Sequence, residues 1–158
     1  MIKKIELPVG LQTAVFVMGE GALEILPEFL KENFPGRKPW IIADGNTYAA
    51  AGKRAQELLA EKSYAPYIFP AEPRLHPDTA LSDMLAAKIA EMPGCVPVAV
   101  GSGVINDLVK VASGQANVTY CCVPTAASVD GYTSSGGVCV EPVYDKVLVE
   151  QLTVNDVL

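Results

Sequence analysis

The sequence contains little of what several classes of function require. Histidine and tryptophan occur once each in 158 residues, and lysine and arginine form no run. A net charge of −6 without a basic stretch argues against a nucleic-acid partner, because nucleic-acid binders present a basic face to phosphates. No apolar stretch approaches the ~20 residues that span a bilayer, and the N-terminus lacks a signal-peptide apolar region. We therefore expect a cytoplasmic protein with no nucleic-acid or membrane partner.

Cysteine and histidine, two of the residue types that bind metals, are also sparse. None of the 4 cysteines forms a CxxC pair, and Cys121 and Cys122 are adjacent in an apolar run, which places their side chains on opposite faces of a strand. We interpret the cysteines as free thiols in the core. The single histidine, His76, lies in a loop before a helix and is expected to be solvated. No Asp/Glu/His cluster has metal-ligand spacing.

Apolar patterning, in contrast, is strong. Hydrophobic residues make up 50% of the chain and charged residues 19%, so the chain should fold as one domain. Short apolar runs alternate with helical patterns, which predicts an α/β fold, a Rossmann-like parallel sheet with helices on both faces. The strands are expected at 13–18, 40–43, 66–69, 96–100 and 118–123. The helices are expected at 22–33, 47–62, from the cap Asp78 to about 92, and 104–113. The segment 138–158 alternates weakly and predicts either a hairpin or an irregular tail.

A glycine turn follows the fourth predicted strand, in the stretch VAVGSGVIND. The chain turns on Gly101, Ser102 and Gly103 into a helix whose first amides lack an internal partner, which favours an anion such as phosphate. The stretch is neither GxGxxG nor a P-loop, so a tight turn without a ligand is the alternative. Asp107, placed in the first turn of that helix, is either a structural helix-start charge or a hydrogen-bond acceptor for a ligand.

A second polar loop, PTAASVDGYTSSGG, follows the fifth predicted strand. It is rich in hydroxyl groups, and its one carboxylate is Asp130. Because parallel strands end at one edge of the sheet, this loop and the glycine turn should open together on a ligand site. A surface turn rich in serine and glycine is the alternative.

Four stretches in order, VFVMGEGALEILPEFL, WIIADGNTY, AVGSGVINDLVKVAS and VPTAASVDGYTSS, cover about residues 13 to 136. Together they resemble the glycerol-1-phosphate dehydrogenase family, which groups with glycerol dehydrogenases, iron-containing alcohol dehydrogenases and dehydroquinate synthases. The patterns SGxIND and PTAxSxDGYxS are the specific ones. The resemblance implies the N-terminal domain of the dehydroquinate synthase-like fold.

The resemblance also implies roles for individual residues. Asp44 matches an acidic residue that contacts the adenosine of NAD or NADP, and Asp130 matches the aspartate that binds the polyol substrate. A carboxylate at Asp44 leans towards NAD, because it repels a 2′-phosphate. Further cofactor contacts are implied at Gly103, Val104, Ile105, Asn106, Asp107, Thr125, Ala126, Ala127, Ser128 and Ser134.

The family reaction implied here is reversible hydride transfer between a nicotinamide cofactor and a polyol phosphate, glycerol-1-phosphate or dihydroxyacetone phosphate, in phospholipid biosynthesis. A divalent metal, zinc or nickel, polarises the reacting oxygen and is held by a helical second domain. We expect a nucleotide-binding domain over 1–137, and over 138–158 a truncated tail where that second domain would be approached.

On this interpretation the 158-residue chain has half of the cleft, so we expect weak or no nucleotide binding and no dehydrogenase activity. Apolar surface left uncovered would favour a homo-oligomer. Three alternatives stay open: part of a glycerol or other polyol dehydrogenase, a stand-alone nucleotide-binding or regulatory module, and a structural oligomerisation fragment that binds nothing.

Overall fold

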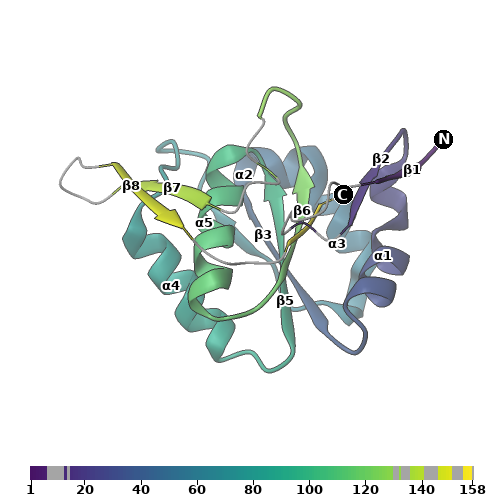
Figure 1. Ribbon diagram of the computed structural model, residues 1–158, viewed down its shortest axis with the longest axis horizontal. Helices are drawn as coiled ribbons and strands as arrows, with labels where there is room; N and C mark the ends of the chain where they lie inside the picture. Colours follow the sequence, from purple (N-terminus) through teal and green to yellow (C-terminus); the bar gives the residue numbers. More distant parts are fainter. Residues whose placement is uncertain are drawn as a thin grey trace.

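The fold is built on one large sheet, seen in a computed structural model (Figure 1). The structure describes residues 1–6, 13, 15–129, 132, 136–140, 146–150 and 155–157, with the backbone alone for the last three ranges. The sheet has seven strands in the order β1-β2-β9-β6-β5-β3-β4, and a separate two-stranded sheet pairs β7 with β8. All neighbours in the large sheet are parallel except β1 and β2. The predicted parallel α/β sheet is thus confirmed.

The elements follow the predicted alternation. The strands are β1 (Lys3–Ile5), β2 (Phe16–Met18), β3 (Lys38–Asp44), β4 (Tyr67–Phe69), β5 (Cys95–Gly101), β6 (Tyr120–Pro124), β7 (Gly136–Val140), β8 (Lys146–Glu150) and β9 (Asn155–Val157). The helices are α1 (Leu26–Asn33), α2 (Gly45–Thr47), α3 (Lys53–Leu59), α4 (Thr79–Ala90) and α5 (Gly103–Gln115). Short 3₁₀ turns at Ala22–Ile25 and Ala60–Lys62 flank α1 and α3.

Helices cover both faces of the sheet, as predicted. Figure 1 shows α4 and α5 on one side of the sheet and α1 and α3 on the other. Each side has its own buried apolar cluster, because alternate residues of a strand point to opposite faces. In β3, Ile42 faces α4 and α5 while Ile41 faces α1 and α3. Both side chains are fully buried, which explains why these strands are apolar at successive positions.

The helix predicted over 47–62 is less regular than expected. It begins at Gly45, passes through a π-helical turn at Tyr48–Gly52 and continues as α3. A Cβ on Gly52 would lie 2.6 Å from Cδ2 of Tyr48, so the ring and the helix backbone are in close contact there. A regular helical pattern of residue types does not reveal such a packing constraint.

The C-terminal segment forms one predicted element and one that the sequence pattern did not predict. The hairpin, one of the two predicted forms, is present as β7 and β8. β9 then enters the large sheet between β2 and β6, with Val157 paired to Phe16 on one side and Cys122 on the other. Three residues are too few for periodicity to mark a strand.

The three cysteines whose side chains the structure describes are buried, as predicted. They are Cys95, Cys121 and Cys122, and Cys121 and Cys122 belong to the clusters on opposite faces of the sheet. Burial raises the pKa of the Cys95 thiol to about 12, against a weaker opposing effect of the Arg37 charge. Burial likewise raises the pKa of Cys122. Neither thiol is therefore an activated nucleophile.

Candidate functional site

The candidate site lies at the carboxyl edge of the sheet, where β3, β4, β5 and β6 end. Open parallel sheets bind ligands at this edge. Two cavities lie there, one of about 200 Å³ and one of about 600 Å³. The smaller cavity lies beside β3, β4 and β5, and its lining residues are Asp44, Asn46, Thr47, Pro70, Ala71, Arg74, Leu75, Ser102 and Val104.

Asp44 ends β3 and caps the helix that follows. Its Oδ1 accepts hydrogen bonds from the backbone N–H groups of Asn46 and Thr47, each at 2.9 Å. In return the Asp44 N–H donates to Oγ1 of Thr47 at 3.0 Å, completing a capping box. One carboxylate oxygen thus orders the turn, and the side chain still lines the smaller cavity. Asp44 therefore combines a structural role with a position suited to the predicted adenosine contact.

The N-terminus of α5 lies between the two cavities. α5 begins at Gly103, and the side chain of its N-cap, Ser102, makes no capping hydrogen bond. The first intrahelical bond runs from the Asn106 N–H to the Ser102 carbonyl at 3.0 Å, so the amides before it have no helical acceptor. A Cβ on Gly103 would have Val129 as its nearest neighbour, at 3.7 Å. The backbone is therefore approachable at a point where an anion is favoured.

The residues of α5 that were predicted to contact the cofactor differ in whether their side chains face the core or a cavity. Ile105 is fully buried and Asn106 is 1% exposed. The Tyr120 hydroxyl donates to Oδ1 of Asn106 at 2.9 Å. Both side chains therefore pack α5 onto the sheet. A ligand at the helix start would meet the backbone amide of Ile105, because the Asn106 N–H already donates to the Ser102 carbonyl. Only Val104 of this group lines a cavity with its side chain.

Asp107 lies just beyond the first turn of α5, one residue further into the helix than predicted. The helix begins at Gly103, and no acidic residue falls in its first turn, so the predicted first-turn position was wrong. Asp107 is half-buried and has an interaction partner. Burial lowers the pKa of the nearby Lys110 amine, and the charge of Asp107 opposes that shift. Asp107 is therefore not the helix-start charge of the structural alternative, and its charge acts instead on Lys110 further along α5.

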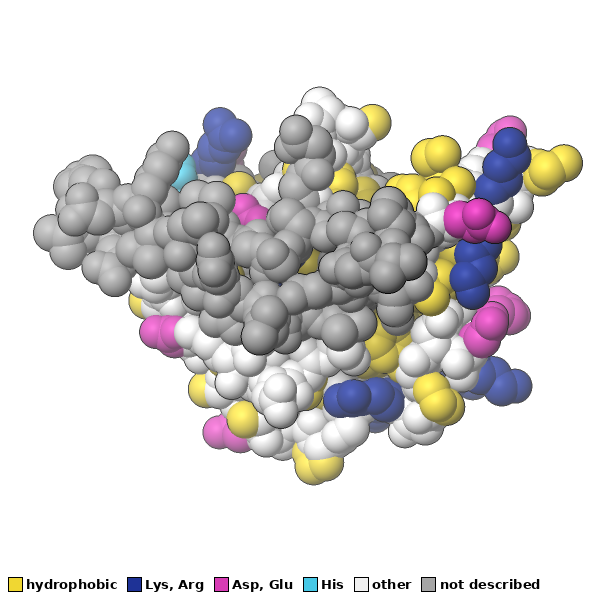
Figure 2. Space-filling view, viewed as in Figure 1, with side chains coloured by type: hydrophobic (Ala, Val, Ile, Leu, Met, Phe, Trp, Pro, Cys, Tyr) yellow, Lys and Arg dark blue, Asp and Glu magenta, His cyan; other side chains and the backbone are white. Residues whose placement is uncertain are grey.

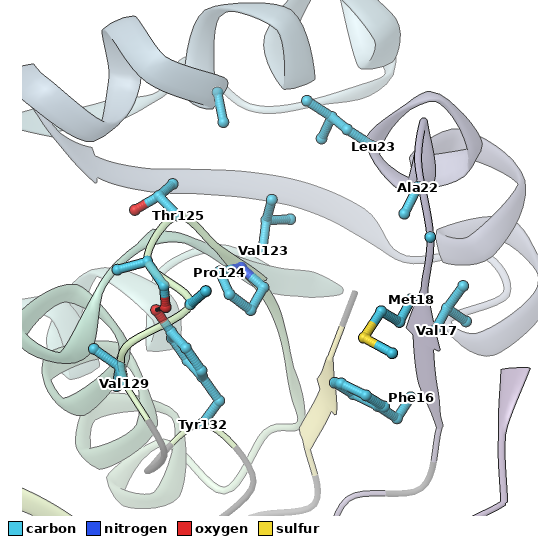
Figure 3. Close-up of a pocket in the computed structure, with 14 residues that line it drawn as sticks. Phe16, Val17, Met18, Ala22, Leu23, Val123, Pro124, Thr125, Val129 and Tyr132 are labelled. Carbon is cyan, nitrogen blue, oxygen red and sulfur yellow. Dashed lines mark hydrogen bonds between the residues drawn. The ribbon is translucent and has the colours of Figure 1, made fainter. Parts of the chain in front are cut away.

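The loop after β6 borders the larger cavity. The Thr125 N–H donates to the Gly101 carbonyl at 3.0 Å, and the Tyr132 hydroxyl donates to the Ala126 carbonyl at 3.0 Å. Figure 3 shows Val129 and Tyr132 on one side of this cavity and Phe16 and Met18 of β2 on the other. Of the predicted contacts, the cavity is lined by Thr125, Ala126 and Ala127.

The loop after β6 also carries predicted contacts that the larger cavity does not include. Ser128 is exposed. Asp130 and Ser134 lie outside the described residues. His76 is exposed in its loop, as predicted.

Sequence reasoning missed the contribution of the loop after β4. Pro70, Ala71, Arg74 and Leu75 all line the smaller cavity. A signal was available, because this loop follows a predicted parallel strand and so opens on the same edge as the glycine turn. It went unnoticed because the loop contains no recognisable motif.

The sequence model of the iron-containing alcohol dehydrogenases matches residues 17–150. The chain belongs to the iron-containing alcohol dehydrogenase family. The glycerol-1-phosphate dehydrogenase [NAD(P)+] of Halalkalibacterium halodurans is 36% identical over 129 residues, covering 75% of this chain and 30% of that protein. The enzyme of the same name from Bacillus subtilis is 30% identical over 128 residues, covering 76% and 31%. This family member therefore spans about a third of the length of the curated relatives it matches.

Solved structures support the same fold. An iron-containing alcohol dehydrogenase from Thermococcus thioreducens superposes with a TM-score of 0.68 at 15% identity, covering 89% of this chain and 43% of that one. A maleylacetate reductase from a Rhizobium species superposes with a TM-score of 0.69 at 12% identity, covering 89% and 39%. The fold is thus the N-terminal α/β domain type of this superfamily, as the sequence resemblance implied.

Proposed function

We propose that this family member is the nucleotide-binding part of an NAD(P)-dependent dehydrogenase that acts on glycerol-1-phosphate or dihydroxyacetone phosphate. One observation carries the proposal: the N-terminus of α5, which has no side-chain cap, lies between two cavities at the carboxyl edge of the sheet. The names of the curated relatives favour this substrate over glycerol or another polyol.

The geometry supports a division of the dinucleotide over three positions. The smaller cavity, about 200 Å³, is below the ~300–1,000 Å³ of sites that enclose a whole drug-sized ligand, so it suits one nucleoside. Pro70 and Leu75 offer apolar surface to a base there, and Asp44 can accept from a ribose hydroxyl. The amides at Gly103 suit the pyrophosphate. The loop Thr125–Ser128 then borders the nicotinamide, which supplies a hydride donor or acceptor when bound.

The residues present do not fit the metal that the resemblance implied. Within the described ranges, no three His, Cys, Asp or Glu side chains group closely enough to hold an ion. The only histidine of the sequence is the exposed His76. We therefore assign no step of the reaction to a metal held by these residues.

Nucleotide binding is the first test. Of the two outcomes expected from the sequence, weak binding or none, the cavities at the sheet edge favour weak but measurable binding. Gly103→Glu should fold normally, since its Cβ has room and a carboxylate at a helix N-terminus is favourable. It should nevertheless weaken NADH and NADPH binding by at least about tenfold, because the new carboxylate occupies the anion position. The measurement is titration of the purified chain, followed by nucleotide fluorescence.

A matched control is Thr79→Glu, which adds the same charge at the first residue of α4, away from both cavities. Saturable binding that survives in Thr79→Glu and is lost in Gly103→Glu would support the proposal. Equal binding by both variants, or none by the folded parent chain, would contradict it.

Turnover is a separate expectation. A polypeptide of these 158 residues should reduce no dihydroxyacetone phosphate above background with NADH or NADPH, with or without added Zn²⁺ or Ni²⁺. The physical reason is that hydride transfer needs the substrate and nicotinamide held together out of water, and these residues match only about a third of the length of the curated relatives. Absorbance at the reduced-nicotinamide band measures the turnover. Metal-dependent turnover by the pure chain would overturn this expectation.

Two further interpretations stay as proposals. A stand-alone nucleotide-binding module is supported by the smaller cavity, which described residues of this chain line. Homo-oligomer formation is supported by exposed apolar side chains at Met1, Ile2 and Met18. Figure 2 shows apolar side chains gathered over the end that carries β1 and β2.

In the part of the chain that the structure describes, none of the helices has the length and apolar character of a membrane span.

A further inference from the structure

The loop that follows β4 brings a cation to the proposed adenosine cavity. In the parallel register of β3 and β4, Asp44 pairs with Phe69, so the chain after Phe69 leaves the sheet directly beside Asp44. The two turns touch, since a Cβ on Gly45 would lie 3.0 Å from Cβ of Ala71. Arg74 lies three residues further along and lines the same cavity as Asp44.

Arg74 is available to a ligand. Its side chain is exposed, and among the described residues it takes part in no ion pair. Asp44 uses Oδ1 for both of its backbone bonds. Neither Glu72 nor His76, which flank Arg74 in the loop, lines the cavity. The cavity thus holds one carboxylate and one guanidinium that do not neutralise each other by direct pairing.

This pair of charges has opposite effects on the two nicotinamide cofactors. A carboxylate accepts a hydrogen bond from the free 2′-hydroxyl of NAD and repels the 2′-phosphate of NADP, whereas a nearby arginine accommodates that phosphate. A guanidinium does so with paired donors that match a phosphate. We propose that Arg74 is the residue that lets this chain accept a 2′-phosphorylated adenosine despite Asp44. The inference rests on the proposed nucleotide-binding function and replaces the leaning towards NAD drawn from Asp44 alone.

Two fragments of the cofactors test the proposal on the chain as it exists. Adenosine 2′,5′-bisphosphate and adenosine 5′-monophosphate differ only in the 2′-phosphate, and both are small enough to probe one cavity. Arg74→Gln should lower the affinity for the bisphosphate by about 10- to 100-fold, the loss expected for a hydrogen bond between charged groups. The affinity for the monophosphate should change by less than about twofold. Titrations followed by nitrogen–proton NMR measure both affinities and report folding in the same spectra.

Two other variants sharpen the test. Lys53→Gln removes the same charge from an exposed position that lines neither cavity, and it should leave both affinities unchanged. Asp44→Asn keeps a side chain that caps helices well but removes the repelling charge, so it should raise the affinity for the bisphosphate.

The outcomes separate the inference from the proposed function. A selective loss of affinity for the bisphosphate in Arg74→Gln would support Arg74 as the 2′-phosphate contact. Equal weakening of both ligands would assign Arg74 to the 5′-phosphate and overturn the inference, while the nucleotide site itself would stand. If the folded parent chain bound neither fragment and neither dinucleotide, the proposed function would fail and the inference with it.

Discussion

Replacing Gly101 with alanine should lower the free energy of unfolding by about 1–3 kcal/mol, the usual cost of overpacking a core. Gly101 ends β5, and a Cβ there would lie 2.6 Å from Cβ and 2.8 Å from Cγ1 of Ile105. Ile105 is fully buried in the first turn of α5, so it has little room to move. The helix start must shift instead, and with it the amides proposed to hold the pyrophosphate.

Gly103→Ala is the matched control for this change. It adds the same methyl group two residues later, where the nearest atom is Cγ1 of Val129 at 3.7 Å. The contact is ordinary, so the expected change in stability is within about 0.5 kcal/mol. The pair therefore separates crowding between β5 and α5 from a general effect of losing a glycine.

Urea unfolding followed by tryptophan fluorescence measures both variants. The single tryptophan, Trp40, is 4% exposed in β3, so its emission reports loss of the core. The Gly101→Ala change should appear as a lower midpoint at unchanged slope, and as a melting temperature about 2–12 °C lower. Equal stability of Gly101→Ala and Gly103→Ala would show that the backbone absorbs the contact without cost.

Tyr120→Phe should destabilise the chain by about 1–3 kcal/mol, because it leaves a buried acceptor without its donor. Tyr120 is fully buried in β6, and its hydroxyl donates to Oδ1 of Asn106 in α5 at 2.9 Å. Asn106 is 1% exposed, so water cannot easily replace the lost donor. The same bond ties the first turns of α5 to the sheet beneath the proposed phosphate position.

Tyr64→Phe is the control for the loss of a tyrosine hydroxyl. Its hydroxyl donates to the Pro93 carbonyl at 3.2 Å at an exposed site, where water takes over, so the expected cost is below about 0.5 kcal/mol. A double-mutant cycle with Asn106→Leu isolates the pair. In the Tyr120→Phe background, Asn106→Leu should cost less than it does alone, because the hydrogen bond that it removes is already absent. Additive effects in the cycle would mean that the hydrogen bond contributes nothing to stability.

Local sequence pattern predicted those elements that are decided by residues close together in the chain. The apolar runs at β3, β5 and β6 are buried on both faces of the sheet, and Asp78 caps α4 by accepting from the Ala80 N–H at 2.8 Å. Strand–helix alternation then implied a parallel sheet whose carboxyl edge bears the glycine turn. The motifs at Asp44, Gly103 and Thr125 are predicted at that edge from the sequence, because parallel strands all end on the same side.

Tertiary structure decided which side chains face that edge and which face the core. Ile105 and Asn106 belong to the motif but point into the interior, since a helix of period 3.6 packed on a sheet must bury one stripe. β9 takes its place between β2 and β6 through hydrogen bonds to strands more than thirty residues away, which no short apolar run can indicate. Arg74 reaches the cavity because the register of β3 against β4 sets its loop beside Asp44. Periodicity and motifs are local properties of a chain, whereas strand register and contacts between loops depend on pairings between distant segments. The sequence by itself therefore determined the sheet and its binding edge. Only the folded chain decided which residues line that edge.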